Sequence, residues 1–303
     1  MEDNSGNRES NSSLTAASLK IIATMVIFGL IGLVRRSIPY SSSMLAFFRG
    51  TIATVILILL RLFNLKGVDR AAIRCNLLPL VISGIMIGFN WILLFEAYRF
   101  TTIAVATISY YMAPIFTIIA SIFILKERLT VRKAICVATA LAGMVFVSGV
   151  LETGISGIKG VLLSMGAALL YSGDVIINKK IKGVQGIDRT IIQMGAAAIS
   201  VLPYWLINED FSTMELAVTP VLLVLASGII FTALPYSLYF SAIQKVPAQT
   251  AAILSYIDPV VAVLVSALVL KESISALTML GTVMVIAAAV ASEISPHRTG
   301  ESS

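Results

Sequence analysis

Long apolar stretches separated by short polar connections dominate this sequence of 303 residues. A membrane-crossing helix needs roughly 20 mostly apolar residues, and ten stretches of suitable length carry charges only near their ends. The ten predicted spans are 18–34, 44–61, 77–95, 102–125, 133–150, 158–178, 190–207, 219–240, 248–270 and 275–292. Their connections are too short for an extramembrane domain with its own core. We therefore expect an all-α integral membrane protein whose function is located inside the helical bundle.

The composition supports a membrane environment, because only 13% of the residues are charged and 58% are hydrophobic. A soluble domain has about a quarter of its residues charged, and a disordered chain needs low hydrophobicity. Cys75 and Cys136 lie far apart, and the one histidine, His297, is near the C-terminus. These residues provide no ligand set for a metal and no disulfide framework. We predict neither a metal nor a cofactor.

The tails and loops predict the orientation of the chain. Residues 1–17 read as a disordered polar N-terminal tail and residues 293–303 as a polar C-terminal tail. Loops on the cytoplasmic side retain Lys and Arg, and with the N-terminus inside, 16 of the 22 basic residues lie on that side. We expect a multi-pass protein of the plasma (inner) membrane with both termini cytoplasmic. The net charge of +6 then reflects orientation, so no nucleic-acid partner is predicted.

The chain contains an internal repeat with a shift of 145 residues. Segments 93–127 and 238–272 are identical at 11 of 35 aligned positions. The shared residues include Phe95 with Phe240, Tyr111 with Tyr256, Pro114 with Pro259, and Lys126-Glu127 with Lys271-Glu272. Shared Pro and Lys-Glu are more informative than shared Ala in apolar helices. We predict two homologous halves, residues 18–150 and 157–292.

Each half contains five predicted spans, so the two halves enter the membrane from opposite sides. The predicted fold is therefore ten transmembrane helices arranged as two inverted-topology five-helix repeats. Inverted repeats recur in secondary transporters, because two similar halves can exchange conformations around a central site. Alternating access is the mechanism that this symmetry predicts.

Two motifs at equivalent places resemble a known family. The first copy contains Ala113-Pro114-Ile115-Phe116 and Leu125-Lys126-Glu127-Arg128-Leu129, and the second contains Asp258-Pro259-Val260-Val261 and Leu270-Lys271-Glu272-Ser273-Ile274. The arrangement resembles the EamA repeat of the drug/metabolite transporter superfamily over about residues 18–292. The resemblance implies a ten-helix transporter of small metabolites. It also implies a central cavity lined by the first four helices of each half, with helices 5 and 10 at the periphery.

Arg49 is a candidate for the chemistry of this cavity. It lies in Phe47-Phe48-Arg49-Gly50 and matches a basic residue common early in the second span of such repeats, whereas the second copy has Met194 in that place. Arg49 could bind an anion, pair with Glu96, or snorkel to the outer interface. Glu96 and Arg99 are three residues apart, which favours a simple ion pair at the membrane boundary.

Two acidic residues are candidate binding or coupling groups, because a charge near the bilayer centre costs roughly 2.5 to 3.5 kcal/mol on insertion scales. Asp258 precedes Pro259 near the middle of the ninth span, where a carboxylate and a locally weakened helix could bind a cation, a proton or an amine. The alternative for Asp258 is a helix-kink cap. Asp174 lies closer to the cytoplasm, and pairing with a nearby lysine is its alternative explanation.

Aromatic and amide side chains predict the walls of the cavity. The candidates are Tyr110, Tyr111, Tyr256, Asn90, Trp91 and Tyr236. Aromatic walls with few polar groups suit amphipathic metabolites, although core packing, or an interfacial belt for Trp91, explains them equally well. Pro114 and Pro259 are predicted helix kinks. Gly84 and Gly88 form a Gly-x-x-x-Gly pattern, which predicts close helix packing, with a dimer interface as the alternative.

We expect a secondary transporter that exports a small organic metabolite, such as an amino acid or a related amphipathic compound. Its partners are the solute and the lipid bilayer, the solute gradient or a proton gradient could drive it, and it could be a monomer or a homodimer. No Gly-x-x-x-x-Gly-Lys-Ser/Thr motif occurs, which disfavours an ATP-driven pump. The alternatives are an integral-membrane lipid-linked transferase and a channel or scaffold. Because acidic clusters with metal-ligand spacing are absent, we do not expect an enzyme.

Overall fold

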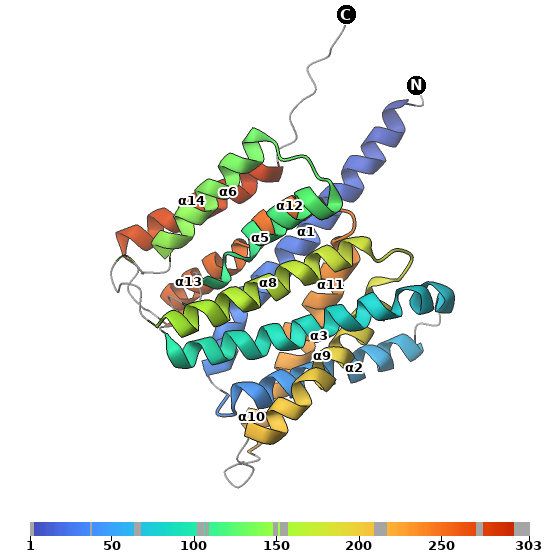
Figure 1. Cartoon of the computed structure of the whole chain (residues 1–303), viewed down its shortest axis with the longest axis vertical. Helices are drawn as coiled ribbons and strands as arrows, with labels where there is room; N and C mark the ends of the chain where they lie inside the picture. Colours follow the sequence, from blue (N-terminus) through green and yellow to red (C-terminus); the bar gives the residue numbers. More distant parts are fainter. Residues whose placement is uncertain are drawn as a thin grey trace, which may run out of the picture.

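The computed structural model describes residues 3–36, 38–63, 68–101, 106, 109–147, 151, 157–208, 217–270 and 275–293, and its regular elements there are all helical (Figure 1). The helices of the first half are α1 (Asp3–Arg36), α2 (Ser42–Phe63), α3 (Arg70–Phe100), α5 (Ala113–Ala120), the π-helix η1 (Ser121–Leu125) and α6 (Val131–Val147). Those of the second half are α8 (Ile158–Lys180), α9 (Gly186–Asn208), α10 (Val218–Gly228), the π-helix η3 (Ile229–Ala233), α11 (Leu234–Ala242), α12 (Ala248–Leu254), α13 (Ile257–Leu270) and α14 (Ala276–Glu293).

Six helical segments are long and apolar enough to cross a membrane. They are Leu14–Ile31, Ser43–Phe63, Arg70–Ala97, Ile158–Lys180, Gly186–Asn208 and Val218–Ala242. The chain is therefore a multi-pass membrane protein. Four predicted spans contain helices outside this set: α5 with η1, α6, α12 with α13, and α14. Most of residues 102–108 lie outside the described residues, so the count of ten spans stays a prediction.

Local sequence explains where several helices begin. The side chain of Asp69 accepts a hydrogen bond of 2.9 Å from the Ala72 amide, which caps α3. Gly157 precedes α8 with a φ of 75°, a left-handed conformation that glycine adopts without strain. Helix α1 begins at Asp3, close to the N-terminus. The helix thus includes residues 3–17, which the composition predicts as part of a disordered tail.

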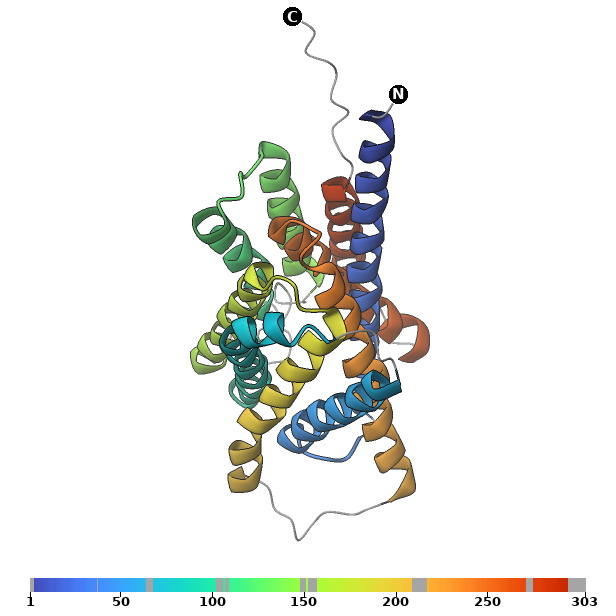
Figure 2. The same ribbon diagram turned by 90° about the vertical axis from the view of Figure 1, so that its right-hand side faces the viewer.

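The helices of each half pack mainly against helices of the other half (Figures 1 and 2). Helix α1 packs against α11 and α13, and its equivalent α8 packs in the same way against α3 and α5. Helix α2 packs against its equivalent α9, and α6 packs against its equivalent α14. Exchanging the two halves leaves this pattern unchanged, as an approximate twofold relation between them requires.

Small residues allow the closest of these approaches. A Cβ atom on Gly84 would lie 2.4 Å from the carbonyl oxygen of Gln193, and a Cβ on Gly88 would lie 2.1 Å from the Ser200 hydroxyl oxygen. Any side chain at either position would therefore push α3 away from α9. The Gly-x-x-x-Gly pattern serves close helix packing inside the chain, as predicted, and the alternative that these two glycines form a dimer interface is wrong.

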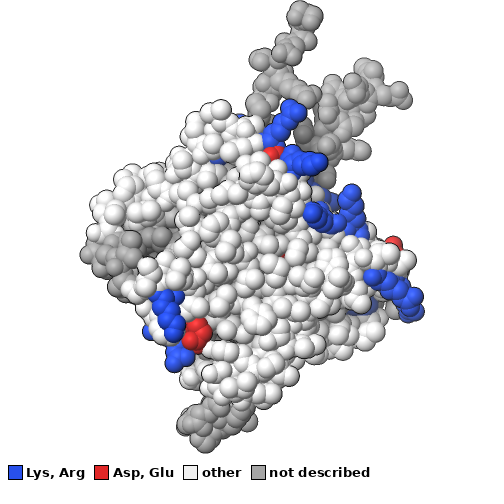
Figure 3. All heavy atoms as spheres, viewed as in Figure 1, with Lys and Arg blue, Asp and Glu red and all other residues white. Residues whose placement is uncertain are grey.

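The outer surface is apolar across the middle of the bundle. Figure 3 shows charged side chains gathered at opposite edges of the visible face, with a broad and almost uncharged band between them. Phe63, Phe123 and Leu268 are among the large apolar residues that are more than three-quarters exposed, at 88%, 77% and 79%. Exposed apolar surface of this extent fits contact with lipid. The start of α1 and the end of α14 lie at the same end of the bundle in both ribbon views (Figures 1 and 2).

Candidate functional site

Two helices are interrupted at equivalent places of the two halves. In the second half, α12 ends at Leu254, a turn follows at Ser255 and Tyr256, and α13 begins at Ile257. In the first half, a turn at residues 111–112 precedes α5, which begins at Ala113. Pro114 and Pro259 each lie in the first turn of the helix that follows the break. Proline is tolerated there because the amide at that position has no partner within the helix.

The equivalent tyrosines at these breaks contact each other. The ring centroids of Tyr111 and Tyr256 are 6.1 Å apart, and the Tyr256 hydroxyl donates a 3.2 Å hydrogen bond to the carbonyl oxygen of Tyr111. Tyr256 is completely buried. The two interrupted helices therefore meet at the residues that the internal repeat shares.

Asp258 lies beside this tyrosine pair. Its side chain is half-buried and is hydrogen-bonded to Tyr111. A Cβ atom on Gly29 would lie 2.6 Å from the Asp258 carbonyl oxygen, so α1 closely approaches the first turn of α13. Asp258 thus connects the break in the second half to helices of the first half.

A small buried cavity lies next to this region. It has a volume of about 20 Å³ and is lined by Phe28, Ile87, Asn90, Tyr171, Asp174, Tyr236 and Tyr239. A water molecule needs about 10 to 15 Å³ on the same scale, so the cavity accommodates one small group. Its walls come from both halves of the chain.

Aromatic contacts join the cavity to the tyrosine pair. The ring centroids of Tyr110 lie 6.2 Å from those of Tyr171 and 5.8 Å from those of Tyr111. On the other side, Tyr236 contacts Trp91 at 6.4 Å and Phe28 at 5.2 Å. All the predicted aromatic candidates therefore belong to one continuous cluster. Trp91 is only 6% exposed, so the alternative that it belongs to an interfacial belt is wrong.

Arg49 is buried against the second half and does not snorkel to the interface. It is 7% exposed, its Nε donates to the Thr232 hydroxyl at 2.9 Å, and its Nη2 donates to the Phe231 carbonyl at 3.3 Å. Both acceptors lie in the π-helix η3, where the widened turn leaves carbonyl groups outside the usual helical pattern. The guanidinium also lies 4.8 Å from the centroid of the Trp91 ring, a cation–π geometry.

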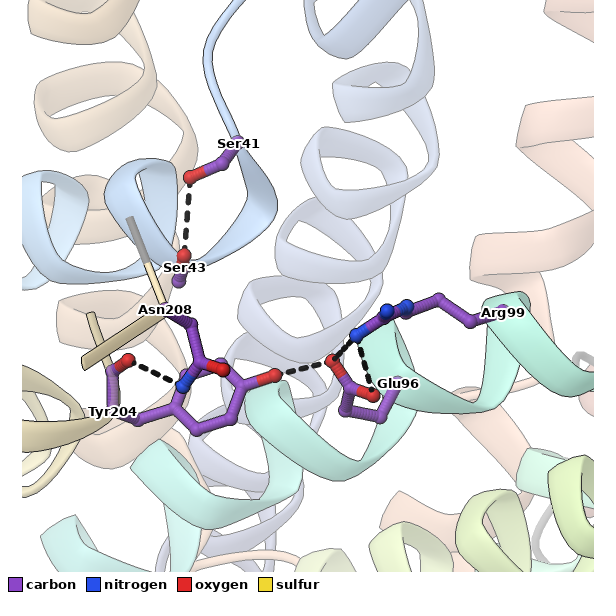
Figure 4. A network of polar contacts seen from close by, with 6 residues as sticks. All are labelled: Ser41, Ser43, Glu96, Arg99, Tyr204 and Asn208. Atoms are coloured by element: carbon purple, nitrogen blue, oxygen red, sulfur yellow. Dashed lines mark hydrogen bonds and ion pairs between the residues drawn. The ribbon is translucent and has the colours of Figure 1, made fainter. Parts of the chain in front are cut away.

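Glu96 has partners other than Arg49. Figure 4 shows its carboxylate bonded to Arg99 and to the hydroxyl of Tyr204. Arg99 Nη1 lies 3.1 and 3.2 Å from the two carboxylate oxygens. The alternative that Glu96 pairs with Arg49 is therefore wrong, whereas the boundary ion pair with Arg99 is confirmed. The hydrogen bond that Arg99 donates to Glu96 raises the pKa of Arg99, which is exposed and stays charged.

Asp174 belongs to a buried polar network between α3, α8 and α9. Its Oδ1 accepts hydrogen bonds from the Ser83 hydroxyl and from Asn178 Nδ2, the latter at 2.8 Å. Gln193 Nε2 donates to the Ser83 hydroxyl at 2.6 Å and to Asn178 Oδ1 at 2.9 Å. We call Ser83, Asp174, Asn178 and Gln193 the Asp174 network. All four are at most 3% exposed.

The lysines near Asp174 point elsewhere. Lys179 Nζ donates to the carbonyl oxygens of Ile243 and Val246, at 3.1 and 2.5 Å. The alternative that a lysine pairs with Asp174 is thus wrong. The described cation that acts on Asp174 is Arg189, whose guanidinium donates to the carbonyls of Asn178 and Ile181, each at 3.2 Å.

A further contact between the halves lies at the end of the repeated segment. The carboxylate of Glu127 accepts hydrogen bonds from the amides of Ala248 and Gln249, at 2.9 and 3.3 Å. These amides begin α12, so a residue of the first half caps an interrupted helix of the second half. The preceding Lys126 adopts a left-handed conformation with a φ of 58°, which turns the chain toward α12. The equivalent residues Lys271 and Glu272 lie outside the described residues.

Sequence reasoning missed three aromatic residues that line the cavity: Phe28, Tyr171 and Tyr239. Two of them had a detectable signal. Tyr171 lies three residues before Asp174, and Tyr239 lies three residues after Tyr236, so each shares a helix face with a predicted residue. Among the described residues, no three His, Cys, Asp or Glu side chains form a group that could hold a metal ion.

Comparisons with known proteins identify the class of protein that this arrangement defines. The EamA-like transporter family matches the chain twice, over residues 15–149 and 158–292. The chain belongs to this family, and hence to the drug/metabolite transporter superfamily. The family points to a transporter and not to an enzyme.

Individual relatives agree with this assignment. The chain is similar to the uncharacterized transporter YxxF of Bacillus subtilis (strain 168), with 25% identity over 92% of this chain and 89% of the relative. It is also similar to an uncharacterized transporter of Clostridium kluyveri, with 28% identity over 82% and 81% of the two chains. A solved crystal structure resembles it with a TM-score of 0.79 at 19% identity, covering 91% of this chain and 96% of the other. That likeness concerns the fold alone.

Proposed function

We propose that this protein is a secondary transporter that moves a small amphipathic metabolite, such as an amino acid, by alternating access. In this proposal, ten spans form two inverted repeats and the solute site lies at their interface. The protein exports its solute across the plasma membrane, and both termini are cytoplasmic. The orientation is supported by the distribution of basic residues. It is also supported by the start of α1 and the end of α14, which lie at the same end of the bundle.

The observation that carries the proposal is the pair of helix interruptions at Tyr111 and Tyr256. Interrupted helices at corresponding places of two repeats expose backbone groups and helix ends at the centre of a transporter. Packing that is unchanged when the halves are exchanged supports it further, because each half can then adopt the conformation of the other.

The proposed site combines the aromatic cluster with three buried or half-buried charges. The rings of Tyr110, Tyr171 and Tyr236 provide apolar walls for the solute. Asp174 and Asp258 are the acidic groups available for binding or for coupling to protons, and Arg49 is the basic group. The cavity holds only one small group, so the arrangement fits a nearly closed state of the transport cycle.

Counterflow into proteoliposomes tests this proposal. We expect a pool of radiolabelled amino acids to enter vesicles saturably, and to enter faster when the vesicles are preloaded with the same unlabelled pool. Uptake that rises linearly with concentration and ignores preloading would indicate a channel and overturn the proposal. Accumulation in everted membrane vesicles tests export, because the cytoplasmic face is then outside.

Asp258→Asn tests the role of the acidic residue beside the break. We expect the initial counterflow rate to fall at least about tenfold, because a charge inside a membrane is retained where it is used. Asp69→Asn is the matched control, since Asp69 is exposed and asparagine caps a helix equally well. An unchanged rate, with an unchanged response to an imposed proton gradient, removes Asp258 from the mechanism.

A further inference from the structure

The cavity beside Asp174 is rich in hydrogen-bond acceptors. Both hydrogen bonds of the Asp174 carboxylate fall on Oδ1, and Oδ2 has none within the described part of the chain. Asn90 uses its Nδ2 to donate to the Ala167 carbonyl at 2.7 Å and to the Tyr110 hydroxyl at 3.4 Å. Its Oδ1 is likewise without a hydrogen bond among the described residues. Both side chains line the cavity and are at most 5% exposed.

The remaining polar lining is phenolic. Tyr171, Tyr236 and Tyr239 contribute hydroxyl groups and aromatic rings, and no Lys or Arg is among the described residues that line the cavity. Hydroxyl oxygens accept hydrogen bonds or coordinate hard cations, and aromatic rings attract a cation over their faces. The lining therefore offers a cation a carboxylate, neutral oxygens and ring faces, whereas among the described residues it offers an anion neutral hydroxyl donors and no positive charge.

The charge of Asp174 lacks a direct counterion. Within the described residues, no basic nitrogen lies within 4.0 Å of its carboxylate, and Arg189 acts on it only from a longer distance while bonded to backbone carbonyls. A buried charge without a partner is costly. A cation inside the cavity would supply the missing partner.

The size of the cavity restricts the occupant. A volume of about 20 Å³ exceeds the roughly 10 to 15 Å³ that one water molecule requires. One dehydrated inorganic cation or one ammonium group fits, whereas a hydrated ion does not. A single carboxylate with neutral oxygens balances one positive charge, which favours a monovalent cation over a divalent one.

We propose that this cavity binds one monovalent cation, held by Asp174 and Asn90 and enclosed by Tyr171, Tyr236 and Tyr239. The cation is either free Na⁺ or the ammonium group of the solute. Binding of the solute's ammonium group rests on the proposed transport function, whereas binding of free Na⁺ does not.

Binding to the wild-type protein in detergent tests the site without requiring transport. ²²Na⁺ and ¹⁴C-methylammonium are offered separately in N-methylglucamine chloride, whose cation is too large for the cavity, and bound label is read by scintillation proximity. Saturable binding of ²²Na⁺ alone identifies the inorganic ion, and saturable binding of methylammonium identifies the ammonium group. Absence of saturable binding for both cations overturns the proposal.

Substitutions locate the bound cation. Asp174→Asn preserves the shape and removes the charge, so we expect the apparent affinity to fall at least about tenfold, since the cation loses its charged ligand. Asp69→Asn is the control and should bind with wild-type affinity. Tyr239→Phe keeps the ring and removes one oxygen, so we expect a smaller decrease in the apparent affinity for the cation. This variant tests the site even if Asp174→Asn fails to fold. Wild-type affinity in Tyr239→Phe and in any folded Asp174→Asn protein overturns the assignment to this cavity.

The cation-binding assay and the counterflow assay test the two proposals separately. Saturable counterflow without cation binding would refute the cation site and leave the transporter intact. Cation binding without counterflow would refute the proposed function and leave the site intact.

Discussion

Two buried polar clusters lie in corresponding parts of the two repeats and differ completely in chemistry. One is the Asp174 network. The other, which we call the Arg49 cluster, consists of Arg49, Trp91 and the η3 residues Phe231 and Thr232. The Arg49 cluster joins α2 to the α10–α11 segment, and the Asp174 network joins α9 and α8 to α3. Helix α9 is the equivalent of α2, and α3 is the equivalent of the α10–α11 segment. The backbone arrangement is thus repeated, while the polar side chains are not.

The sequence confirms this asymmetry position by position. The residue 145 positions after Arg49 is Met194, and the residue 145 positions before Thr232 is Ile87. The equivalents of the Asp174 network are Gly29 for Asp174, Gly228 for Ser83, Leu33 for Asn178 and Phe48 for Gln193. Each half therefore has its buried charge where the other half has an apolar residue or glycine. A repeated backbone permits exchange of conformations, while the buried charges differ: the first half contributes the basic Arg49 and the second half the acidic Asp174.

Arg49→Met removes the basic charge of the Arg49 cluster by copying Met194 into the first half. We expect at least about a 100-fold decrease in the initial counterflow rate, since a buried charged group with hydrogen bonds contributes about 3 kcal/mol. Arg74→Met is the control, because Arg74 is exposed on α3, and its rate should stay within about twofold of wild type. Wild-type transport by Arg49→Met would mean that the basic charge of the Arg49 cluster is dispensable.

Ser83→Ala weakens the Asp174 network, because the Ser83 hydroxyl contacts Asp174, Asn178 and Gln193. We expect the free energy of unfolding to fall by about 1 to 2 kcal/mol, the upper range for hydrogen bonds inside membrane proteins. Thermal unfolding in detergent measures the change.

Ser164→Ala is a matched control for this experiment. Ser164 is as buried as Ser83, at 0% exposure, but its hydroxyl has no hydrogen-bond partner in the described structure. The same atom is therefore removed without loss of a hydrogen bond, and stability should be unchanged or higher. Equal destabilisation by both substitutions would show that packing, and not the network, determines the effect.

The sequence predicts the helices better than the polar contacts. Hydropathy locates the long spans because each crossing must be apolar over its whole length, and the repeat predicts the matching tyrosines at the two breaks. Sequence patterns within one helix also find the pair of Glu96 and Arg99, since three-residue spacing places both on one face.

Contacts between distant helices are beyond such reasoning. Nothing in the sequence around Ser83 indicates its hydrogen bond to Asp174, because that contact forms only when α3, α8 and α9 pack together. Similarly, Lys179 is close to Asp174 in sequence but donates its hydrogen bonds to other partners. Arg49 shows the same limit, because its acceptor carbonyl depends on the π-helix η3. Tertiary packing decides which buried polar groups meet, and that information is distributed over the whole chain.

The ends of the repeated segment extend the comparison, because there the two halves carry the same residues. Glu127 caps α12, and its equivalent 145 residues later is Glu272. If the halves exchange conformations, the caps act in opposite states. Glu127→Gln should then favour release of α12, and Glu272→Gln should favour its retention.

Removing either cap should have a smaller effect than the substitutions at Arg49, Asp174 and Ser83. A carboxylate at a helix N-terminus contributes about 0.3 to 1 kcal/mol, which corresponds to a shift of about two- to fivefold in the equilibrium. A cysteine placed at Gln249, which is fully buried, reports on release through its rate of maleimide labelling in a Cys75→Ser background. We expect Glu127→Gln to increase this rate and Glu272→Gln to decrease it. Equal changes in the same direction would mean that the two caps do not alternate, and the symmetry of the backbone would then be a feature of packing without a role in switching.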